Sequence, residues 1–396
     1  MEILKLRITG SAGTYKVSAQ VDGDPATDDL GPLPEQLAEH LATVQESILR
    51  TTESLPNQAE SRERRPPPAH PTGEDRPPVR GFGFAAGADS VDIQQIGKRL
   101  FDCVFQPEIY ELYKERLEAA SRDHTELQIK LCVEAPELIH VPWEMMFDKR
   151  RLFHLSCSQV TPFARVATMH ELDLHICEEP PLRVLCMVSA PKDFAGTQYE
   201  LQTDVEVARL DRALQPLRND NQVRLCWATP GTRRQLKTRI VKGDDGKKWD
   251  VFLFIGHGLE GSLVLEEDGG SSYEMVKADV LRGLLEGENG PKLVILNSCR
   301  GATKREDRLA STAETLVKGG GIAAVVAMQF DISDRMGSTF GPSFFSNLML
   351  GVSVQRAMTL TRLDLQGDGF TEWISPVLYM QSKDGRVLRD AGALAV

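Results

Sequence analysis

WDVFLFIGHG (residues 249–258) and LVILNSCRG (residues 293–301) are the two stretches that decide the fold of this chain. Each opens with a continuous apolar run and closes with glycine and polar residues. A short continuous apolar run predicts a strand that is buried on both faces, as in a parallel sheet covered by helices. In such sheets, ligands and catalytic groups gather just beyond the carboxyl ends of the strands, which is where these polar residues stand.

The same alternation of apolar strands and amphipathic helices extends from residue 182 to residue 379. It favours a mostly parallel sheet, because a parallel connection needs a crossover that a helix usually supplies. We therefore expect an α/β fold with helices on both faces of the sheet. The predicted strands are 182–189, 223–229, 249–256, 293–297, 322–328 and 377–379, the predicted helices are 203–217, 232–241, 276–285, 310–318, 335–349 and 352–365, and a short hairpin is expected around 261–265.

The upstream part of the chain has a mixed α and β pattern. Apolar and polar residues alternate over residues 1–21, which predicts a hairpin, and Pro107 divides an amphipathic stretch over 91–117 into two helices. Seven prolines and no aromatic residue occur from Pro56 to Arg80, a composition typical of an exposed linker. Further expected elements are a helix at 34–50, a strand at 127–133 and a β-pair of 152–155 with 160–166; the expected domains are an N-terminal hairpin and helix region (1–55), a Pro-rich linker (56–88), an upstream half (89–178) and a catalytic core (179–396).

Composition excludes several classes of protein. The chain has 396 residues and a formal net charge of −11, which argues against a sequence-independent grip on nucleic acid. No apolar run approaches the roughly 20 residues that cross a bilayer, and the N-terminus lacks the apolar core of a signal peptide. Seven cysteines without a CxxC pair indicate reduced thiols in a cytoplasmic protein.

The two strand ends combine a histidine with a cysteine. If the two strands are neighbours, the His257 imidazole and the Cys299 thiol face each other, as a histidine base and a cysteine nucleophile do. A facing imidazolium would lower the pKa of the thiol and favour the reactive thiolate. The backbone N–H groups of Gly258 and Cys299 could form an oxyanion hole. Either residue alone is more often structural, but the pair at this spacing favours catalysis.

These motifs resemble those of the caspase-like cysteine peptidases (the clan of caspases, separase and gingipain), and more closely the CHAT family of bacterial peptidases. GHGLEGSLVLEEDGG, VILNSC, GGIAAVVAMQFDISD and SPVLYM follow that family's order, and LQIKLCVEAPELIHVPWEMMFD resembles the half that precedes its protease core. The resemblance implies a caspase–hemoglobinase-like fold and peptide-bond hydrolysis through an acyl-enzyme, with no metal and no cofactor. It also implies bacterial defence, with a protein substrate, for example a gasdermin-like pore former, and an activating sensor or regulatory protein.

Three acidic residues are candidates for an S1 pocket that reads a basic P1 side chain by charge pairing. Asp331 and Asp334 follow the predicted strand 322–328, in a segment that resembles an acidic segment of separase, and Asp193 follows the first core strand, 182–189. The competing interpretation is a helix N-cap, for which Ser333 or Asp334 would serve.

Other interpretations stay open or find little support. A catalytically silent scaffold of the same fold and a thiol-dependent acyltransferase are alternatives, whereas a nucleotide-binding protein would need a phosphate loop that the sequence lacks. His170, His175 and Cys177 do not have the spacing of zinc ligands on one helical face. The Pro-rich stretch and the charged loop Gly243–Lys248 are the expected handles for control. Deletion of residues 1–80 is expected to change activation more than folding.

Overall fold

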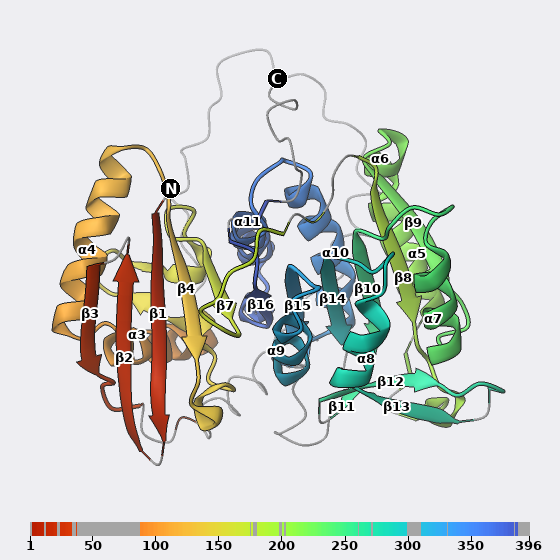
Figure 1. Cartoon of the computed structure of the whole chain (residues 1–396), viewed down its shortest axis with the longest axis horizontal. Helices are drawn as coiled ribbons and strands as arrows, with labels where there is room; N and C mark the ends of the chain where they lie inside the picture. The colour runs from red at the N-terminus through yellow and green to blue at the C-terminus, as the bar shows by residue number, and fades with distance from the viewer. Residues whose placement is uncertain are drawn as a thin grey trace.

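The computed structural model has one large sheet with helices packed on both faces (Figure 1). The described residues are 2–11, 13–21, 24–33, 37, 88–174, 176, 180–197, 200–201, 203–259, 261–270, 272–298, 310–330, 332–383 and 385–386. Within them the sheet has 11 strands in the order β3-β2-β1-β4-β7-β16-β15-β14-β10-β8-β9. Their bounds are β1 (Glu2–Ser11), β2 (Thr14–Val21), β3 (Asp24–Asp29), β4 (Leu127–Val133), β7 (Phe163–Val166), β8 (Leu182–Val188), β9 (Val223–Ala228), β10 (Val251–Gly256), β14 (Leu293–Ser298), β15 (Ala324–Met328) and β16 (Pro376–Met380).

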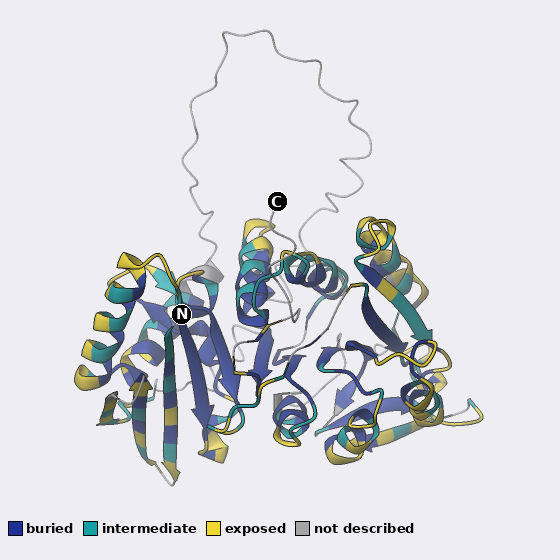
Figure 2. Cartoon of the chain, turned by 45° about the horizontal axis from the view of Figure 1, so that its top comes forward, coloured by how far each residue is buried: buried dark blue, intermediate teal, exposed yellow. Residues whose placement is uncertain are grey.

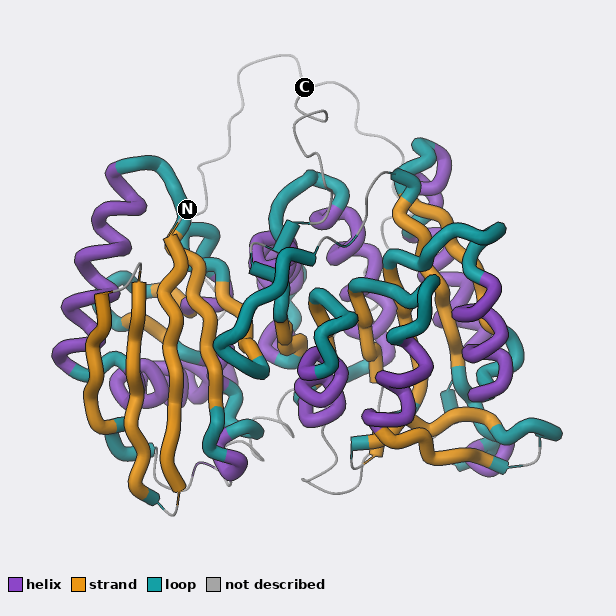
Figure 3. The backbone as a smooth tube through the Cα atoms, viewed as in Figure 1, coloured by secondary structure: helices purple, strands orange, loops and turns teal. Residues whose placement is uncertain are grey.

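Helices cover both faces of the sheet because alternate strand residues point to opposite sides. In β10, Val251, Leu253 and Ile255 join one apolar cluster, whereas Phe252 and Phe254 join a second cluster on the other face. The first cluster includes residues of α3 (Ala88–Val104), α4 (Pro107–Arg122), α5 (Thr203–Ala213), α10 (Asp334–Leu348) and α11 (Val354–Gly367), and the second includes residues of α7 (Arg233–Lys242), α8 (Ala278–Leu285) and α9 (Ala310–Lys318). Figure 2 shows the strands as the most buried layer between these helices, and Figure 3 shows the same arrangement by secondary structure.

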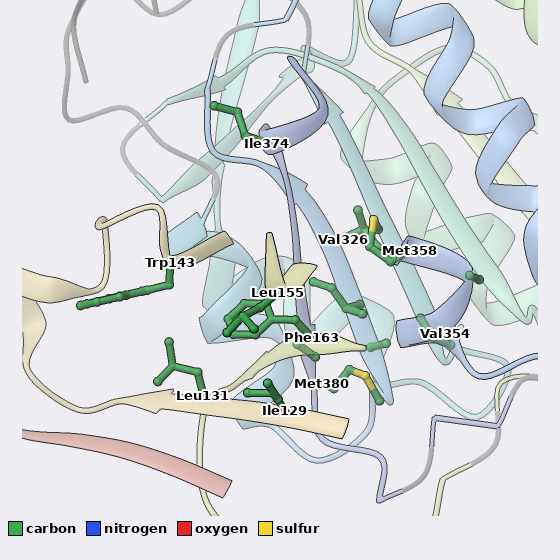
Figure 4. Packing of buried hydrophobic residues seen from close by; sticks show 14 of the residues in the cluster. Ile129, Leu131, Trp143, Leu155, Phe163, Val326, Val354, Met358, Ile374 and Met380 are labelled. Atoms are coloured by element: carbon green, nitrogen blue, oxygen red, sulfur yellow. The ribbon is translucent and has the colours of Figure 1, made fainter. Parts of the chain in front are cut away.

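The sheet is mostly parallel, as predicted. Among the described strands, seven of the ten pairings in this sheet are parallel and three are antiparallel. Strand direction reverses where β15 meets β16, so that a parallel group around β4 and a parallel group around β10 run in opposite senses. Figure 4 shows side chains of both groups packed together, with Ile129 and Phe163 on one side and Val326 on the other.

The N-terminal hairpin is confirmed and forms part of the main sheet. β1 pairs with β2 on one side and with β4 on the other, and Leu4, Leu6 and Ile8 are fully buried in the larger apolar cluster. Deletion of residues 1–80 would therefore remove the three strands at one end of the sheet and core side chains with them. We accordingly expect that deletion to impair folding, contrary to the expectation from sequence.

Most other expected elements of the core are found within a few residues of their predicted bounds. The break at Pro107 is confirmed, since α3 ends at Val104 and α4 begins at Pro107. The β-pair of 152–155 with 160–166 is wrong, because β6 (Phe153–His154) pairs with β5 (Phe147–Asp148) and β7 joins the main sheet. The hairpin around 261–265 is part of a three-stranded sheet of β11 (Gly258–Leu259), β12 (Ser262–Glu266) and β13 (Tyr273–Lys277). The expected helix at 34–50, apart from Leu37, and the linker at 56–80 lie outside the described residues.

Candidate active site

A row of buried polar residues stands at or just beyond the carboxyl ends of four adjacent strands. Ser189 follows β8, His257 follows β10, Asn297 lies at the end of β14 and Gln329 follows β15. The exposed fraction of each is 4% or less. Polar residues are seldom so deeply buried unless they are hydrogen-bonded or functional, so this edge of the sheet is the candidate site.

The two strands that sequence analysis singled out are neighbours in register. β10 and β14 are parallel, and Gly256 is the Cα partner of Ser298. The next residue along β10 is His257, and the next along the chain from β14 is Cys299, which lies outside the described residues. The condition on which the dyad hypothesis rested, that these strands be adjacent, is therefore met.

His257 is held by backbone and aromatic contacts. Its carbonyl oxygen accepts a hydrogen bond from Val264 N–H at 3.0 Å, and the ring of Phe194 packs edge-on against the imidazole at 5.1 Å between centroids. Phe194 in turn stacks on Tyr273 at 5.4 Å. This aromatic support is not evident from the sequence, because the three residues come from separate elements.

The lack of a side chain at Gly256, the residue before His257, leaves room for the ring of Phe254. A Cβ placed at this position would lie 2.4 Å from the Phe254 ring, which folds back against the backbone. A larger residue here would therefore displace a fully buried phenylalanine. The glycine is needed for space, since no positive φ is recorded for it.

The N–H of Gly258 points away from β12. Gly258 pairs with Leu263, and Val264 donates its N–H to the carbonyl of His257. This pattern makes Gly258 and Leu263 a non-hydrogen-bonded pair, in which both N–H groups are directed away from the partner strand. The N–H of Gly258 is thus oriented outward from the hairpin, as an oxyanion donor would need to be.

Glu266, at the end of β12, ties together the loops around the site. Its carboxylate oxygens accept hydrogen bonds from the N–H of Ala190, after β8, and of Gly231, after β9, both at 3.2 Å. This role of Glu266 is not evident from the sequence, because its two hydrogen-bond donors lie in the loops after two different strands.

Each of the described cysteines has a thiol pKa above its ordinary value, whereas a catalytic thiol needs a lowered pKa. Burial raises the pKa of Cys103 to about 12, of Cys132 to about 11 and of Cys157 to about 12. Burial also raises the pKa of Cys186 and of Cys226. These five thiols are therefore protonated and unreactive at neutral pH.

The structure describes the three S1 candidates to different extents. Asp331 lies outside the described residues, and of Asp334 only the backbone is described, at the start of α10. Ser333 is the N-cap of α10, because its hydroxyl accepts the N–H of Met336 at 3.1 Å. Asp193, in a short 3-10 turn (Lys192–Phe194), is exposed and accepts a hydrogen bond from the Ser272 hydroxyl at 3.0 Å.

A buried ion pair lies beside the end of β15. Arg165 forms a bidentate pair with Glu144, and both side chains are at most 1% exposed. The Gln329 amide joins the pair, accepting from Arg165 at 3.1 Å and donating to Glu144 at 2.9 Å. Burial alone would raise the pKa of Glu144, but the Arg165 guanidinium outweighs it and lowers that pKa. This pair anchors the segment that leads to Asp331.

The described residues hold neither a group of metal ligands nor a helix that could span a membrane. Within them no group of three or more His, Cys, Asp or Glu side chains could hold a metal ion, and His175 and Cys177 lie outside them. None of the helices in the described part of the chain is long and apolar enough to cross a membrane.

Comparison with known families decides the classification. The model of the CHAT domain family matches residues 94–375. This chain belongs to the CHAT domain family. Membership confirms the family resemblance, and the strand pairings confirm the predicted α/β fold class with a mostly parallel sheet between helices.

Two solved structures are similar to this CHAT protein. One is the separase–securin complex of Saccharomyces cerevisiae, with a TM-score of 0.48, 13% identity and coverage of 96% of this chain. The other is a secreted C11 cysteine protease of Bacteroides thetaiotaomicron bound to an irreversible peptide inhibitor, with a TM-score of 0.30, 11% identity and coverage of 44% of this chain. The chain spans 30% of the separase chain and 56% of the C11 protease chain. No curated protein matches the sequence.

Proposed function

We propose that this CHAT protein is a cysteine endopeptidase in which Cys299 is the nucleophile and His257 is the general base. The observation that carries the proposal is the register of β10 and β14, with Gly256 opposite Ser298 at the ends of adjacent parallel strands. Because the strands run side by side, the next residue on each is expected at the same edge of the sheet. Five described thiols have a raised pKa, and of the other two cysteines, Cys177 and Cys299, Cys299 is the one that directly follows a strand adjacent to β10.

The proposed reaction proceeds through an acyl-enzyme. His257 takes the thiol proton, and the Cys299 thiolate attacks the carbonyl carbon of the scissile peptide bond. The N–H groups of Gly258 and Cys299 stabilise the oxyanion, and the outward direction of the Gly258 N–H supports this role. The intermediate collapses when His257 gives its proton to the leaving amine. Water, deprotonated by His257, then attacks the thioester and releases the acid product and the free thiol.

Specificity is proposed to come from Asp331, with Asp334 and Asp193 as further candidates for the S1 pocket. Ser333 caps α10, so the helix N-cap does not need either aspartate. Asp193 shares its turn with Phe194, which packs on His257. A carboxylate so near the dyad could pair with a basic P1 side chain.

The cellular role is proposed by analogy. We infer a cytoplasmic protein that acts in bacterial defence on a protein substrate, for example a gasdermin-like pore former, after activation by a sensor or regulatory protein. We also propose that the chain is divided into four units: an N-terminal region (1–55), a Pro-rich linker (56–88), an upstream half (89–178) and a catalytic core (179–396). The separase comparison concerns a protein in complex with securin, which agrees with control through a protein partner.

Covalent labelling tests the dyad. The purified protein, alone and with cell extract to supply an activator, is incubated with a peptide epoxide or chloromethylketone carrying P1 arginine, and labelled peptides are mapped by mass spectrometry. We expect a label on Cys299 that His257→Ala abolishes and that the matched control His170→Ala retains. Cys299→Ala should end cleavage at a packing cost of no more than about 1–2 kcal/mol. Labelling of another cysteine, or none on Cys299 under either condition, would contradict the proposal.

A further inference from the structure

A cavity lies at the opposite ends of the strands that lead to the proposed dyad. It has a volume of about 430 Å³ and is lined by residues that immediately precede β10 (Trp249 and Asp250) and β14 (Lys292). This volume is in the usual range for small-molecule sites. Because β10 and β14 separate the cavity from His257, it is not part of the candidate active site.

Positive charges outnumber negative ones among the residues that line the cavity. Its wall holds four cationic side chains, and Asp250 and Glu288 are its acidic residues. Asp250 is engaged by Arg183, since its carboxylate accepts the Arg183 N–H at 2.7 Å and lies 3.7 Å from the guanidinium. Glu288 is exposed. The four cationic residues are Arg183, Lys247, Lys248 and Lys292.

The three lysines are not neutralised by the described part of the protein. No ion pair within 4.0 Å joins Lys247, Lys248 or Lys292 to a described carboxylate. The ammonium of Lys292 donates instead to the Gly321 carbonyl at 2.8 Å. Burial lowers the pKa of Lys292, the positive charge of Lys248 lowers it further, and the Glu286 carboxylate opposes this. Two cations thus repel each other across the cavity, and a bound anion would relieve that repulsion.

A tight turn presents two of the lysines. Asp244 and Lys247 exchange backbone hydrogen bonds at 2.9 and 3.0 Å, and Gly246 completes the turn with a φ of +78°. The turn lies in the charged loop Gly243–Lys248, which sequence analysis selected as a handle for control. Lys247 and Lys248 project from a fixed backbone, so less ordering is needed when they bind a ligand.

We propose that this cavity binds a small oligophosphate, that is, a compact anion with two or more linked phosphates. Three ammonium groups that form no ion pair with a described carboxylate match several phosphate charges better than the single charge of a carboxylate ligand, and lysine binds phosphate as a point charge. Inorganic oligophosphate and a nucleoside triphosphate share this chemistry. The proposal does not depend on peptidase activity.

Direct binding tests the proposal with the full chain. Inorganic tripolyphosphate is titrated by calorimetry at constant ionic strength with EDTA present, into wild-type protein and into Lys248→Gln and Lys292→Met. We expect one saturable site in the wild type and about tenfold weaker binding in each variant, a change equivalent to ~1.4 kcal/mol. The matched control is Lys237→Gln, an exposed lysine of α7 outside the cavity, which should bind as the wild type does.

A titration with ATP distinguishes a nucleotide from a simple phosphate chain, and the choice of variants keeps the test informative if one of them misfolds. ATP binding more tightly than tripolyphosphate would indicate a nucleotide, and equal or weaker binding would indicate the phosphate chain alone; both support the site. Lys248 is exposed, so Lys248→Gln keeps the test valid if Lys292→Met fails to fold. Absence of saturable binding, or equal weakening in Lys237→Gln and Lys248→Gln, would overturn the proposal.

Discussion

Two groups of buried polar residues in the same sheet differ in how fully they are hydrogen-bonded. In the cluster of Glu144, Arg165 and Gln329, every side-chain nitrogen and oxygen has a partner. In the row at the other strand ends, Ser189 Oγ and Asn297 Oδ1 have no hydrogen-bond partner within the described part of the protein. A satisfied cluster stabilises a unique arrangement, whereas unsatisfied polar atoms mark places kept for a ligand or for chemistry.

The largest expected effect comes from breaking the satisfied cluster. Arg165→Met leaves Glu144 charged and buried, which should lower the free energy of unfolding by about 3–5 kcal/mol. The double variant Arg165→Met with Glu144→Met removes both charges and should regain most of that loss. Urea denaturation followed by tryptophan fluorescence measures both. If the single variant were as stable as the double variant, the ion pair would not act as one structural unit.

Next in size is the effect of Asp331 on specificity. A charge-assisted contact with P1 arginine contributes about 2–4 kcal/mol, so Asp331→Asn should lower kcat/KM for basic P1 residues by roughly 30–1000-fold and spare uncharged ones. Ser333→Ala is the matched control, because loss of the α10 cap should cost about 0.5–2 kcal/mol of stability without changing P1 preference. A P1 library compares the two. An equal ratio across all P1 residues would assign Asp331 a structural role.

The pH dependence of stability offers a third test, centred on His154. This ring lies against Phe147 and Trp373, and burial, opposed by its hydrogen bond to the Met145 carbonyl, lowers its pKa to about 4. Below about pH 6.5 the His154 imidazole binds a proton in the unfolded chain but stays neutral in the native state. The free energy of unfolding should therefore fall by about 2–3 kcal/mol between pH 6.5 and 4.

His154→Gln should flatten that pH profile, and the exposed His170→Gln should leave it unchanged. Urea denaturation at several pH values measures the slope. A profile equally steep in His154→Gln and wild type would assign the acid sensitivity to other groups, the Glu144 pair among them.

The smallest expected effect concerns Ser189. Its hydroxyl is buried without a partner within the described residues, so Ser189→Ala should change stability by less than about 1 kcal/mol, or raise it slightly. Thermal unfolding measures this, with Ser156→Ala as the control, because the Ser156 hydroxyl donates to the Glu144 carbonyl at 2.7 Å. A large loss in Ser189→Ala would show that its hydroxyl is satisfied and structural.

Local sequence patterns were sufficient for the core strands and for the residues at their ends. β10 and β14 begin as short continuous apolar runs, which are typical of strands buried on both faces. The position of His257 just after β10 follows from where that run stops, and the role of Cys299, which lies outside the described residues, stays a prediction. Even the break between α3 and α4 is local, since proline lacks the N–H that a helix interior needs.

Long-range pairing was decided only by the tertiary structure. Nothing in residues 1–21 indicates that β1 lies between β2 and β4, or that Asp28 of β3 accepts the first N–H groups of α4 at Glu108 and Ile109. Glu266 contacts two separate crossovers, and Gln329 completes an ion pair from the upstream half. Such contacts depend on which strands become neighbours. That choice is set by burial summed over the whole sheet, whereas the sequence by itself determined which segments form strands and which chemistry stands at their ends.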